Sequence, residues 1–369
     1  MDQALLHAER VILNNHGRPL RNSPPASARR LLAPPRSLMR GQDPSVVWRH
    51  GWFYLAQSEN GERGITGIFI YRSRTIHGLG RPGECQRRCV WIAPRKGPIS
   101  RNLWAPELAW VDGLGREASP RGERSGGQGR WYIYFAADDG RNENHRMYAL
   151  ESESADACGP YQLKGKVAAP GADRWAIDGA LIDVEEPLGG GRRLYFVWSG
   201  WEGLHNGMQR LFVARMSDPW TITGERVEIS RPDASWERRS GPHPCYVNEG
   251  PAVAVRGGKV VVGFSANGFW SDDYCVGILS CDVERILDPH AWTKSIAPAF
   301  CKTDALFGVG HNCFVKAGDG AEAQWWNVFH AVRRPGRGGK GREIFAQRMG
   351  WENGLPALGR PGDPVMSMA

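Results

Sequence analysis

One short phrase recurs five times along the chain, and this repetition restricts the fold more than any other feature. Each copy runs from a polar or aromatic residue into an apolar stretch, a turn and a second apolar stretch. Successive copies begin 61, 74, 71 and 62 residues apart, which is an irregular period. A repeated unit of this length predicts a ring or a solenoid. The five copies begin at Asp43, Trp104, Asp178, Glu249 and His311.

The segments between the copies indicate what each unit contains. Short apolar runs separated by Gly-rich turns predict a four-stranded sheet in each unit. Five such sheets around one axis make a five-bladed β-propeller, so the predicted fold class is all-β. A β-sandwich is the alternative, and the aromatic-rich second strand shared by several units disfavours it. Helical structure is expected only at residues 4–13 and, as a single turn, within 283–289.

The repeats also set the expected domain boundaries. We expect residues 38–360 to form one catalytic domain, 1–37 an N-terminal tail that is disordered or a leader, and 361–369 a C-terminal tail. Charged residues interrupt the apolar stretch that a secretory signal needs, so a secreted and a cytoplasmic location both stay open. No run approaches the length of a membrane span, and no membrane partner is expected. Residues 114–130 and 185–193 are interpreted as insertions that shape the cleft.

The formal net charge of +8 does not by itself indicate a nucleic-acid partner. Many arginines lie in the tail and in turns such as RRPGRGGKGR, which is typical of a solvated surface, and no nucleic-acid motif is present. We therefore expect no nucleic-acid partner. The eight cysteines lack paired metal-binding spacing and are expected to be mostly free thiols, with a Cys85–Cys89 disulfide left open.

The first residues of the five copies form the candidate site. In a propeller the first strand of each blade lines the central channel, so these residues converge. Alignment on Pro44, Pro106 and Pro251 places them at equivalent positions to within one or two residues. A single Asp before Pro or Gly is typical of a turn, because Asp bonds its own backbone there. The recurrence of three acids at equivalent positions favours catalysis instead.

Three carboxylates around one axis predict glycoside hydrolysis. Two of them can supply a general acid and a general base on either side of a glycosidic bond. The charge of the third raises the pKa of a neighbour, so Asp178 is expected to keep Glu249 protonated while ionised Asp43 activates water. His311 is expected near the axis. Trp104 is expected either to stack on a sugar or to belong to the core.

The same residues carry a family resemblance. The runs GQDPSVV, NLWAPELAW, WAIDGALI, VNEGPAVAV and GVGHNCF occur in this order and resemble glycoside hydrolase family 43, in particular its α-L-arabinofuranosidase-type members. The similarity covers roughly residues 38–355. It implies an inverting hydrolase that releases terminal α-L-arabinofuranosyl residues from arabinan, arabinoxylan or their oligosaccharides. A β-xylosidase, an endo-arabinanase and a non-catalytic carbohydrate-binding propeller remain alternatives.

The resemblance also implies a role for each matching residue. Asp43 would be the general base and Glu249 the general acid, and Asp178 would tune the pKa of Glu249 and orient the substrate. His311 matches a histidine beside a channel cation, commonly calcium, so a structural calcium ion is implied although the chemistry requires no cofactor. Arg342 matches an arginine that reaches toward the sugar. The run GVGHNC departs from the family's usual GPGHNS-like run beside that cation.

Overall fold

The computed structural model describes residues 35–362 apart from 61–65, 114–128, 186–190 and 243–244. The described residues all belong to one compact unit. The described residues are all-β: they contain strands and short 3-10 turns but no α-helix. Within this part of the chain, no helix has the length and apolar character that crossing a bilayer requires.

The first two copies of the phrase each open a four-stranded antiparallel sheet. Unit 1 consists of β2 (Ser45–Arg49), β3 (Trp52–Asn60), β4 (Thr66–Ser73) and β5 (Gln86–Ile92). Unit 2 consists of β6 (Arg101–Val111), β7 (Arg130–Asp138), β8 (Arg146–Ser152) and β9 (Tyr161–Val167). In both units the strands pair in sequence order, as hairpin-rich β sequences predict.

The next two copies also open antiparallel units, which are joined into one sheet. Unit 3 consists of β10 (Ala176–Glu185), β11 (Arg192–Trp201) and β12 (Met208–Asp218), with short β13 (Thr221–Ile222) and β14 (Val227–Ser230) at its edge. Unit 4 consists of β15 (Tyr246–Arg256), β16 (Lys259–Ala266), β17 (Cys275–Asp282) and β18 (Thr293–Lys294). A two-residue parallel pairing between β12 and β15 joins the two units.

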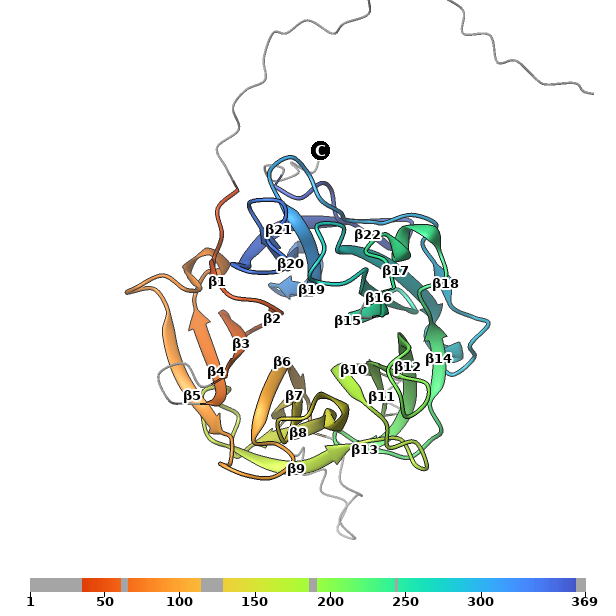
Figure 1. Cartoon of the computed structure of the whole chain (residues 1–369). Helices are drawn as coiled ribbons and strands as arrows, with labels where there is room; N and C mark the ends of the chain where they lie inside the picture. Colours follow the sequence, from red (N-terminus) through yellow and green to blue (C-terminus); the bar gives the residue numbers. More distant parts are fainter. Residues whose placement is uncertain (1–34, 61–65, 114–128, 186–190, 243–244, 363–369) are drawn as a thin grey trace, which may run out of the picture. The chain divides into compact units, whose positions relative to one another are not determined.

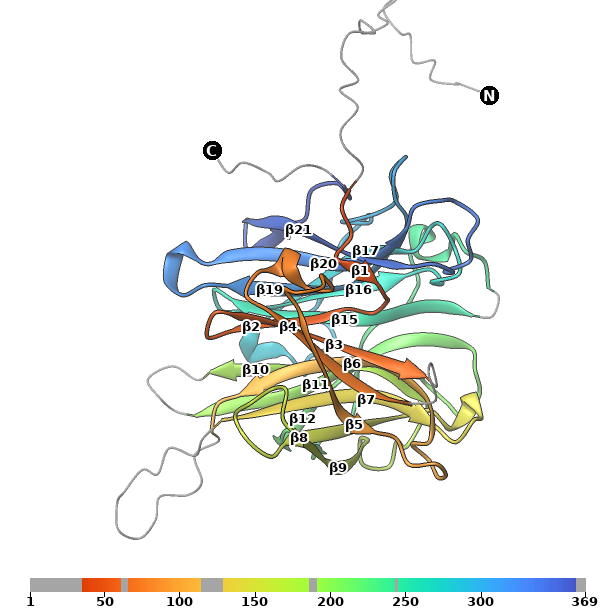
Figure 2. The ribbon, with the colours of Figure 1, turned by 90° about the vertical axis from the view of Figure 1, so that its left-hand side faces the viewer.

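The last unit takes a strand from the beginning of the described chain. Unit 5 consists of β19 (Phe307–Ala317), β20 (Gln324–Val332), β21 (Glu343–Glu352), β22 (Leu355–Ala357) and β1 (Met39–Arg40). Strand β1 pairs antiparallel with β21, and Figure 2 shows it crossing toward unit 5. The Val46 N–H also donates to Cys313 Sγ at 3.3 Å, so the first and last units are tied together twice.

The inner strands of the five units form a closed ring. Each of β2, β6, β10, β15 and β19 contacts the next, β19 contacts β2, and Figure 1 shows all five around one centre. Residues from all five inner strands line one cavity of about 150 Å³. The ring that the repeats predict is therefore present, with the first strand of each unit innermost.

Apolar side chains fill the spaces between neighbouring units and hold the ring together. Tyr134 and Phe196 belong to one cluster between units 2 and 3, and Leu55 and Val328 belong to another between units 1 and 5. Comparable clusters lie at the other three junctions. Burial of one such side chain contributes about 1.5–3 kcal/mol. Each unit therefore depends on both of its neighbours for stability.

Two local predictions have a definite outcome. The helical turn expected within 283–289 is present as a 3-10 turn, Val283–Arg285, whereas residues 4–13 lie outside the described residues. Cys85 and Cys89 are free thiols, so the disulfide that the sequence left open is not formed.

The expected cleft insertions, 114–130 and 185–193, lie largely outside the described residues. Their described flanks, Val111 paired with Arg130 and Glu185 paired with Arg192, are at the strand ends remote from Trp104 and Asp178. The described flanking residues therefore do not border the candidate site.

Candidate active site

The backbone adopts the same unusual conformation at the start of every inner strand. In each unit a residue at the aligned position has a φ angle in the left-handed region, and four of these five residues are not glycine; Asn102 and Gly308 near the starts of two inner strands also have such angles. In units 2 to 5 the strand ladder shifts register at this point. Non-glycine residues with such angles cluster at functional sites. The five residues are Asp43 (49°), Ala105 (40°), Asp178 (54°), Gly250 (57°) and His311 (44°).

This conformation refines the alignment that the sequence suggests. Asp43, Asp178 and His311 occupy the left-handed position itself, whereas Trp104 and Glu249 each precede it by one residue. Unit 4 requires glycine here, because a Cβ on Gly250 would lie 3.1 Å from the ring of His311. Glu249 and His311 can therefore approach the axis from adjacent units without a steric clash.

Asp43 lies among cationic and imidazole groups. Its Oδ1 is 3.3 Å from His311 Nδ1 and 3.5 Å from Arg342 Nη1. Burial by itself would raise the pKa of this carboxyl, but the charges of His311 and Arg342 outweigh it. The pKa of Asp43 therefore lies well below its ordinary range, and the group is a carboxylate at neutral pH.

Two histidines hold Asp43 in different ways. His330 Nδ1 accepts the Asp43 backbone N–H at 3.1 Å, and the same nitrogen lies 3.2 Å from Asp43 Oδ1. Burial lowers the pKa of His330 to about 4, and this ring is neutral. Burial also acts against charge on His311, but Asp43 and Asp178 raise its pKa to about 10. His311 is therefore the imidazolium that balances the acids.

Glu249 lies in surroundings of the opposite kind. Burial and the nearby charge of Asp178 raise its pKa to about 8, so it is protonated at neutral pH. The Tyr274 hydroxyl donates to Glu249 Oε1 at 2.8 Å, which leaves Oε2 for the proton. Tyr274 directly precedes β17 and is fully buried. Its ring lies over Gly310, where a Cβ would be only 2.2 Å from the Tyr274 ring.

Asp178 connects the two acids electrostatically. Burial raises its pKa to about 6, against the opposing charge of His311 and together with the repulsion from Asp43. Its Oδ2 accepts the Gly250 N–H at 3.1 Å. This contact fixes the peptide directly after Glu249, so Asp178 positions the neighbouring acid as well as raising its pKa.

Arg342 lies beside this group of acids, whereas Trp104 packs against His145. Arg342 is mostly buried, lies against Asp43 and places its guanidinium over the ring of Phe269, 4.7 Å from the centroid. Trp104 is half-buried, and one face of its indole stacks on His145 with ring centroids 3.9 Å apart. His145 therefore takes one face of Trp104, and only the remaining surface is free for a sugar.

The donors around His311 limit what cation the site can hold. His311 Nε2 is buried without a hydrogen-bond partner, and Glu107 Oε1 lies 3.8 Å away. Among the described residues, no group of three or more His, Cys, Asp or Glu side chains is arranged to hold a metal. Calcium takes roughly six to eight oxygen ligands, and His311 as an imidazolium has no lone pair to offer a metal, so the residues around it do not fit a calcium ion. We derive no catalytic step through such an ion.

Several residues of the site were missed by sequence reasoning, although all belong to conspicuous runs. Glu107 lies in WAPELAW, Tyr274 in YCVGILSCD and His330 in WWNVFHA. None of them opens a repeat, and that position was the only signal used. His311 also depends on a missed residue, because its backbone N–H donates to Ser265 Oγ at 2.7 Å.

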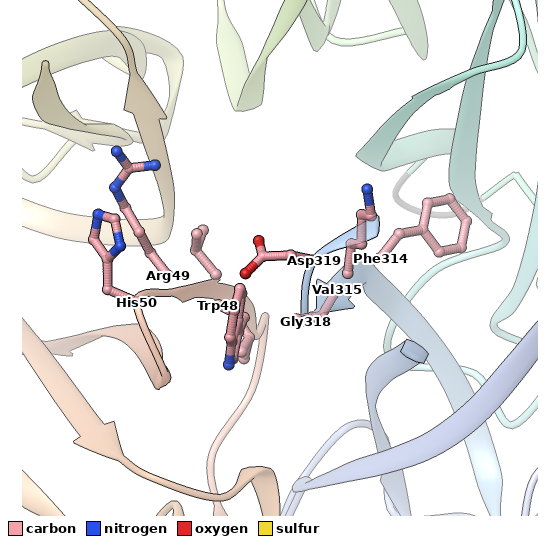
Figure 3. A pocket seen from close by; sticks show the side chains of 10 residues that line it. Trp48, Arg49, His50, Phe314, Val315, Gly318 and Asp319 are labelled. Carbon is pink, nitrogen blue, oxygen red and sulfur yellow. The ribbon is translucent and has the colours of Figure 1, made fainter. Parts of the chain in front are cut away.

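A second hollow, of about 420 Å³, lies between β2 and β19 at their other ends. Figure 3 shows Trp48, Arg49 and His50 on one side of it and Phe314, Val315 and Asp319 on the other. None of the residues predicted for catalysis lines this hollow. It is therefore separate from the acids.

Comparison with known proteins agrees with this geometry. The chain is 34% identical over 258 residues to the extracellular exo-α-(1→5)-L-arabinofuranosidase of Streptomyces avermitilis, which covers 69% of this chain and 47% of that protein. It is 31% identical over 290 residues to α-L-arabinofuranosidase 43 of Humicola insolens, covering 77% and 53%. The chain thus spans about half the length of these curated relatives.

A solved structure and a family match complete the comparison. The α-L-arabinofuranosidase of Lactobacillus brevis superposes with a TM-score of 0.72 at 27% identity, covering 89% of this chain and 96% of that one. Such family 43 neighbours imply a five-bladed propeller, in accord with the closed ring of five inner strands. Residues 35–356 match the family described as Glycosyl hydrolases family 43. The chain belongs to glycoside hydrolase family 43.

Proposed function

We propose that this protein is an inverting α-L-arabinofuranosidase whose catalytic domain is a five-bladed β-propeller. One observation carries the proposal: the ring brings together an ionised carboxylate, Asp43, and a protonated carboxyl, Glu249. An acid and a base that coexist at the same pH are what single-step hydrolysis of a glycosidic bond requires.

The proposed reaction is a single displacement. Glu249 donates its proton to the glycosidic oxygen as the bond to the anomeric carbon breaks. Asp43 accepts a proton from a water molecule whose oxygen attacks the opposite face of that carbon. The products are free arabinose of inverted configuration and the shortened glycan. The next cycle requires only that the proton return from Asp43 to Glu249 through solvent.

The neighbouring residues support this division of roles. Asp178 raises the pKa of Glu249 and holds the Gly250 peptide. Arg342 stabilises the carboxylate of Asp43, and its position beside that oxygen places it within reach of a sugar bound there. Trp104 is proposed to border the sugar with the part of its indole that His145 does not cover.

The proposed substrates are arabinan, arabinoxylan and their oligosaccharides. The support is the 31–34% identity to proteins named as arabinofuranosidases. A hydrolase of this kind needs no cofactor for the chemistry itself, since the two carboxyl groups supply all the proton transfers.

Proton NMR during hydrolysis tests the mechanism. The first arabinose signal should belong to the anomer of inverted configuration, and a retained anomer as first product would refute the assignment of Asp43 as base. Nitrophenyl α-L-arabinofuranoside, nitrophenyl β-xyloside and linear arabinan, assayed in parallel, distinguish the proposed activity from β-xylosidase and endo-arabinanase. Sugar binding measured by calorimetry without any hydrolysis would indicate a non-catalytic propeller.

A further inference from the structure

A Gly/Arg-rich loop, residues 333–342, forms part of the rim beside the acids. It connects β20 to β21 at the ends nearest Asp43. Both carboxylate oxygens of Asp272 accept the Gly336 N–H, at 3.0 and 2.9 Å, and the Asp272 carbonyl accepts the Gly308 N–H at 3.1 Å. The loop is therefore fastened to the β16–β17 connection and to β19.

This loop encloses a cationic cavity of about 400 Å³. Its only acidic residue, Glu343, is engaged by Arg333, whose Nε and Nη2 lie 2.9–3.1 Å from the carboxylate. Within the described part of the chain, no carboxylate forms an ion pair with any of the other four cations. These four are Arg40, Arg334, Arg337 and Lys340.

The cavity lies next to the proposed catalytic base. In the backbone pairing of β1 with β21, Arg40 lies opposite Glu343. The Gly41 N–H donates to the Arg342 carbonyl at 3.2 Å. The side chain of Arg342 then lies 3.5 Å from Asp43. The cavity and the carboxylate of Asp43 are therefore both formed by the short segment 40–43 and by the loop that ends at Arg342.

We propose that this cavity binds the carboxylate of a uronic acid residue in the glycan, so that the protein selects acidic arabinose-containing substrates over neutral ones. The inference rests on the proposed function and adds a substrate class to it. Guanidinium groups match the two oxygens of a carboxylate, and such charged hydrogen bonds are stronger than neutral ones. The net charge of +8 favours approach of an acidic polymer as well.

Calorimetry on two matched oligosaccharides tests the inference directly. Both carry a terminal arabinofuranose, and only one carries a uronic acid on the adjoining backbone. The wild-type protein should bind the acidic oligosaccharide about tenfold more tightly, and Arg334→Gln/Arg337→Gln should abolish the preference while leaving the neutral Kd unchanged. The control, Arg88→Gln/Arg256→Gln, removes two exposed cations remote from Asp43 and should keep the preference. Raising the salt concentration should reduce the preference of the wild type for the acidic oligosaccharide.

Several results would overturn the inference. Equal affinity of the wild type for both oligosaccharides would do so, and so would an equal loss on both in the loop variant. If the loop variant loses affinity for a DNA oligonucleotide but keeps the wild-type glycan preference, the loop binds a different polyanion and not the uronic acid. Hydrolysis of nitrophenyl α-L-arabinofuranoside, too small to reach the cavity, is measured separately. Its absence in the wild type would refute the proposed function, whereas the binding comparison would still decide the inference.

Discussion

The surroundings of Asp43 and of Glu249 differ in one respect that decides the chemistry. Both carboxyl groups are buried at the start of an inner strand, so burial raises the pKa of each. Around Asp43, however, lie an imidazolium and a guanidinium, which overcome the cost of burying the charge. Around Glu249 lie a phenol and another acid.

The comparison shows that the neighbouring side chains, rather than the depth of burial, determine which carboxyl group is the acid and which is the base. The same ring geometry delivers both groups, and only the residues from neighbouring units distinguish them. Unit 5 provides His311 and Arg342 to unit 1, whereas unit 3 provides Asp178 to unit 4. Breaking either set of partners should therefore make the two carboxyl groups more alike.

Glu249→Gln should have the largest effect, because it removes the only proposed proton donor. We expect hydrolysis of arabino-oligosaccharides to fall by about 10²–10⁴-fold. The loss should be much smaller on a dinitrophenyl arabinoside, whose leaving group needs no proton. Steady-state rates on both substrates measure this, and full activity on the oligosaccharide would refute the role of Glu249.

Asp43→Asn should reduce activity by a comparable factor, and the loss should be the same on the oligosaccharide and on the dinitrophenyl arabinoside. A better leaving group does not replace the base that activates water, so both substrates should lose activity together. Rates for the two variants on the same substrate pair therefore distinguish acid from base. Rescue of Asp43→Asn by the activated substrate would contradict the assignment.

Arg342→Gln should have an intermediate effect. Removing this cation leaves Asp43 less strongly stabilised as a carboxylate, so its pKa rises toward the ordinary value. The acidic limb of the pH–rate profile should move to higher pH, and kcat/KM should fall by about tenfold. Arg348→Gln, in β21 directly after the loop and with its guanidinium over Trp326, is the matched control. An unchanged acidic limb in Arg342→Gln would contradict the electrostatic role.

Asp178→Asn should move the opposite limb. The wild-type rate should decline above about pH 8, where Glu249 loses its proton. Without the negative charge of Asp178, the ionised form of Glu249 becomes less unfavourable and its pKa falls. The alkaline limb should therefore move to lower pH, which a profile of kcat/KM would show. A shift to higher pH would refute the tuning role.

Tyr274→Phe should have the smallest effect. The hydroxyl stabilises ionised Glu249, so its removal raises the pKa of Glu249 and moves the alkaline limb upward by less than about one pH unit. Tyr148→Phe in β8, remote from Glu249, should leave the profile unchanged. A downward shift in Tyr274→Phe would show that the contact with Glu249 is wrongly assigned.

Much of the fold could be predicted because the repeat is written in the sequence. Apolar runs that recur at an irregular period predict the inner strands, and the prolines after Asp43, Ala105 and Gly250 mark the left-handed position in three of five units. The turn expected within 283–289 is present as the 3-10 turn Val283–Arg285. The role of β1 in closing unit 5 carries no sequence signal, since two residues show no period.

The sequence by itself determined the ring of five units and the positions of the three acids. The sequence suggested that Asp43 is ionised and Glu249 protonated, but only the tertiary structure decided which partners cause this difference, because pKa values depend on distances between side chains of different units. His330, for example, is 287 residues from Asp43 along the chain but in contact with it. The cationic cavity arises in the same way, from a loop and a strand at opposite ends of the described chain. The repeat determines where the inner strands start, whereas the ionisation of each acid depends on which side chains from different units contact it.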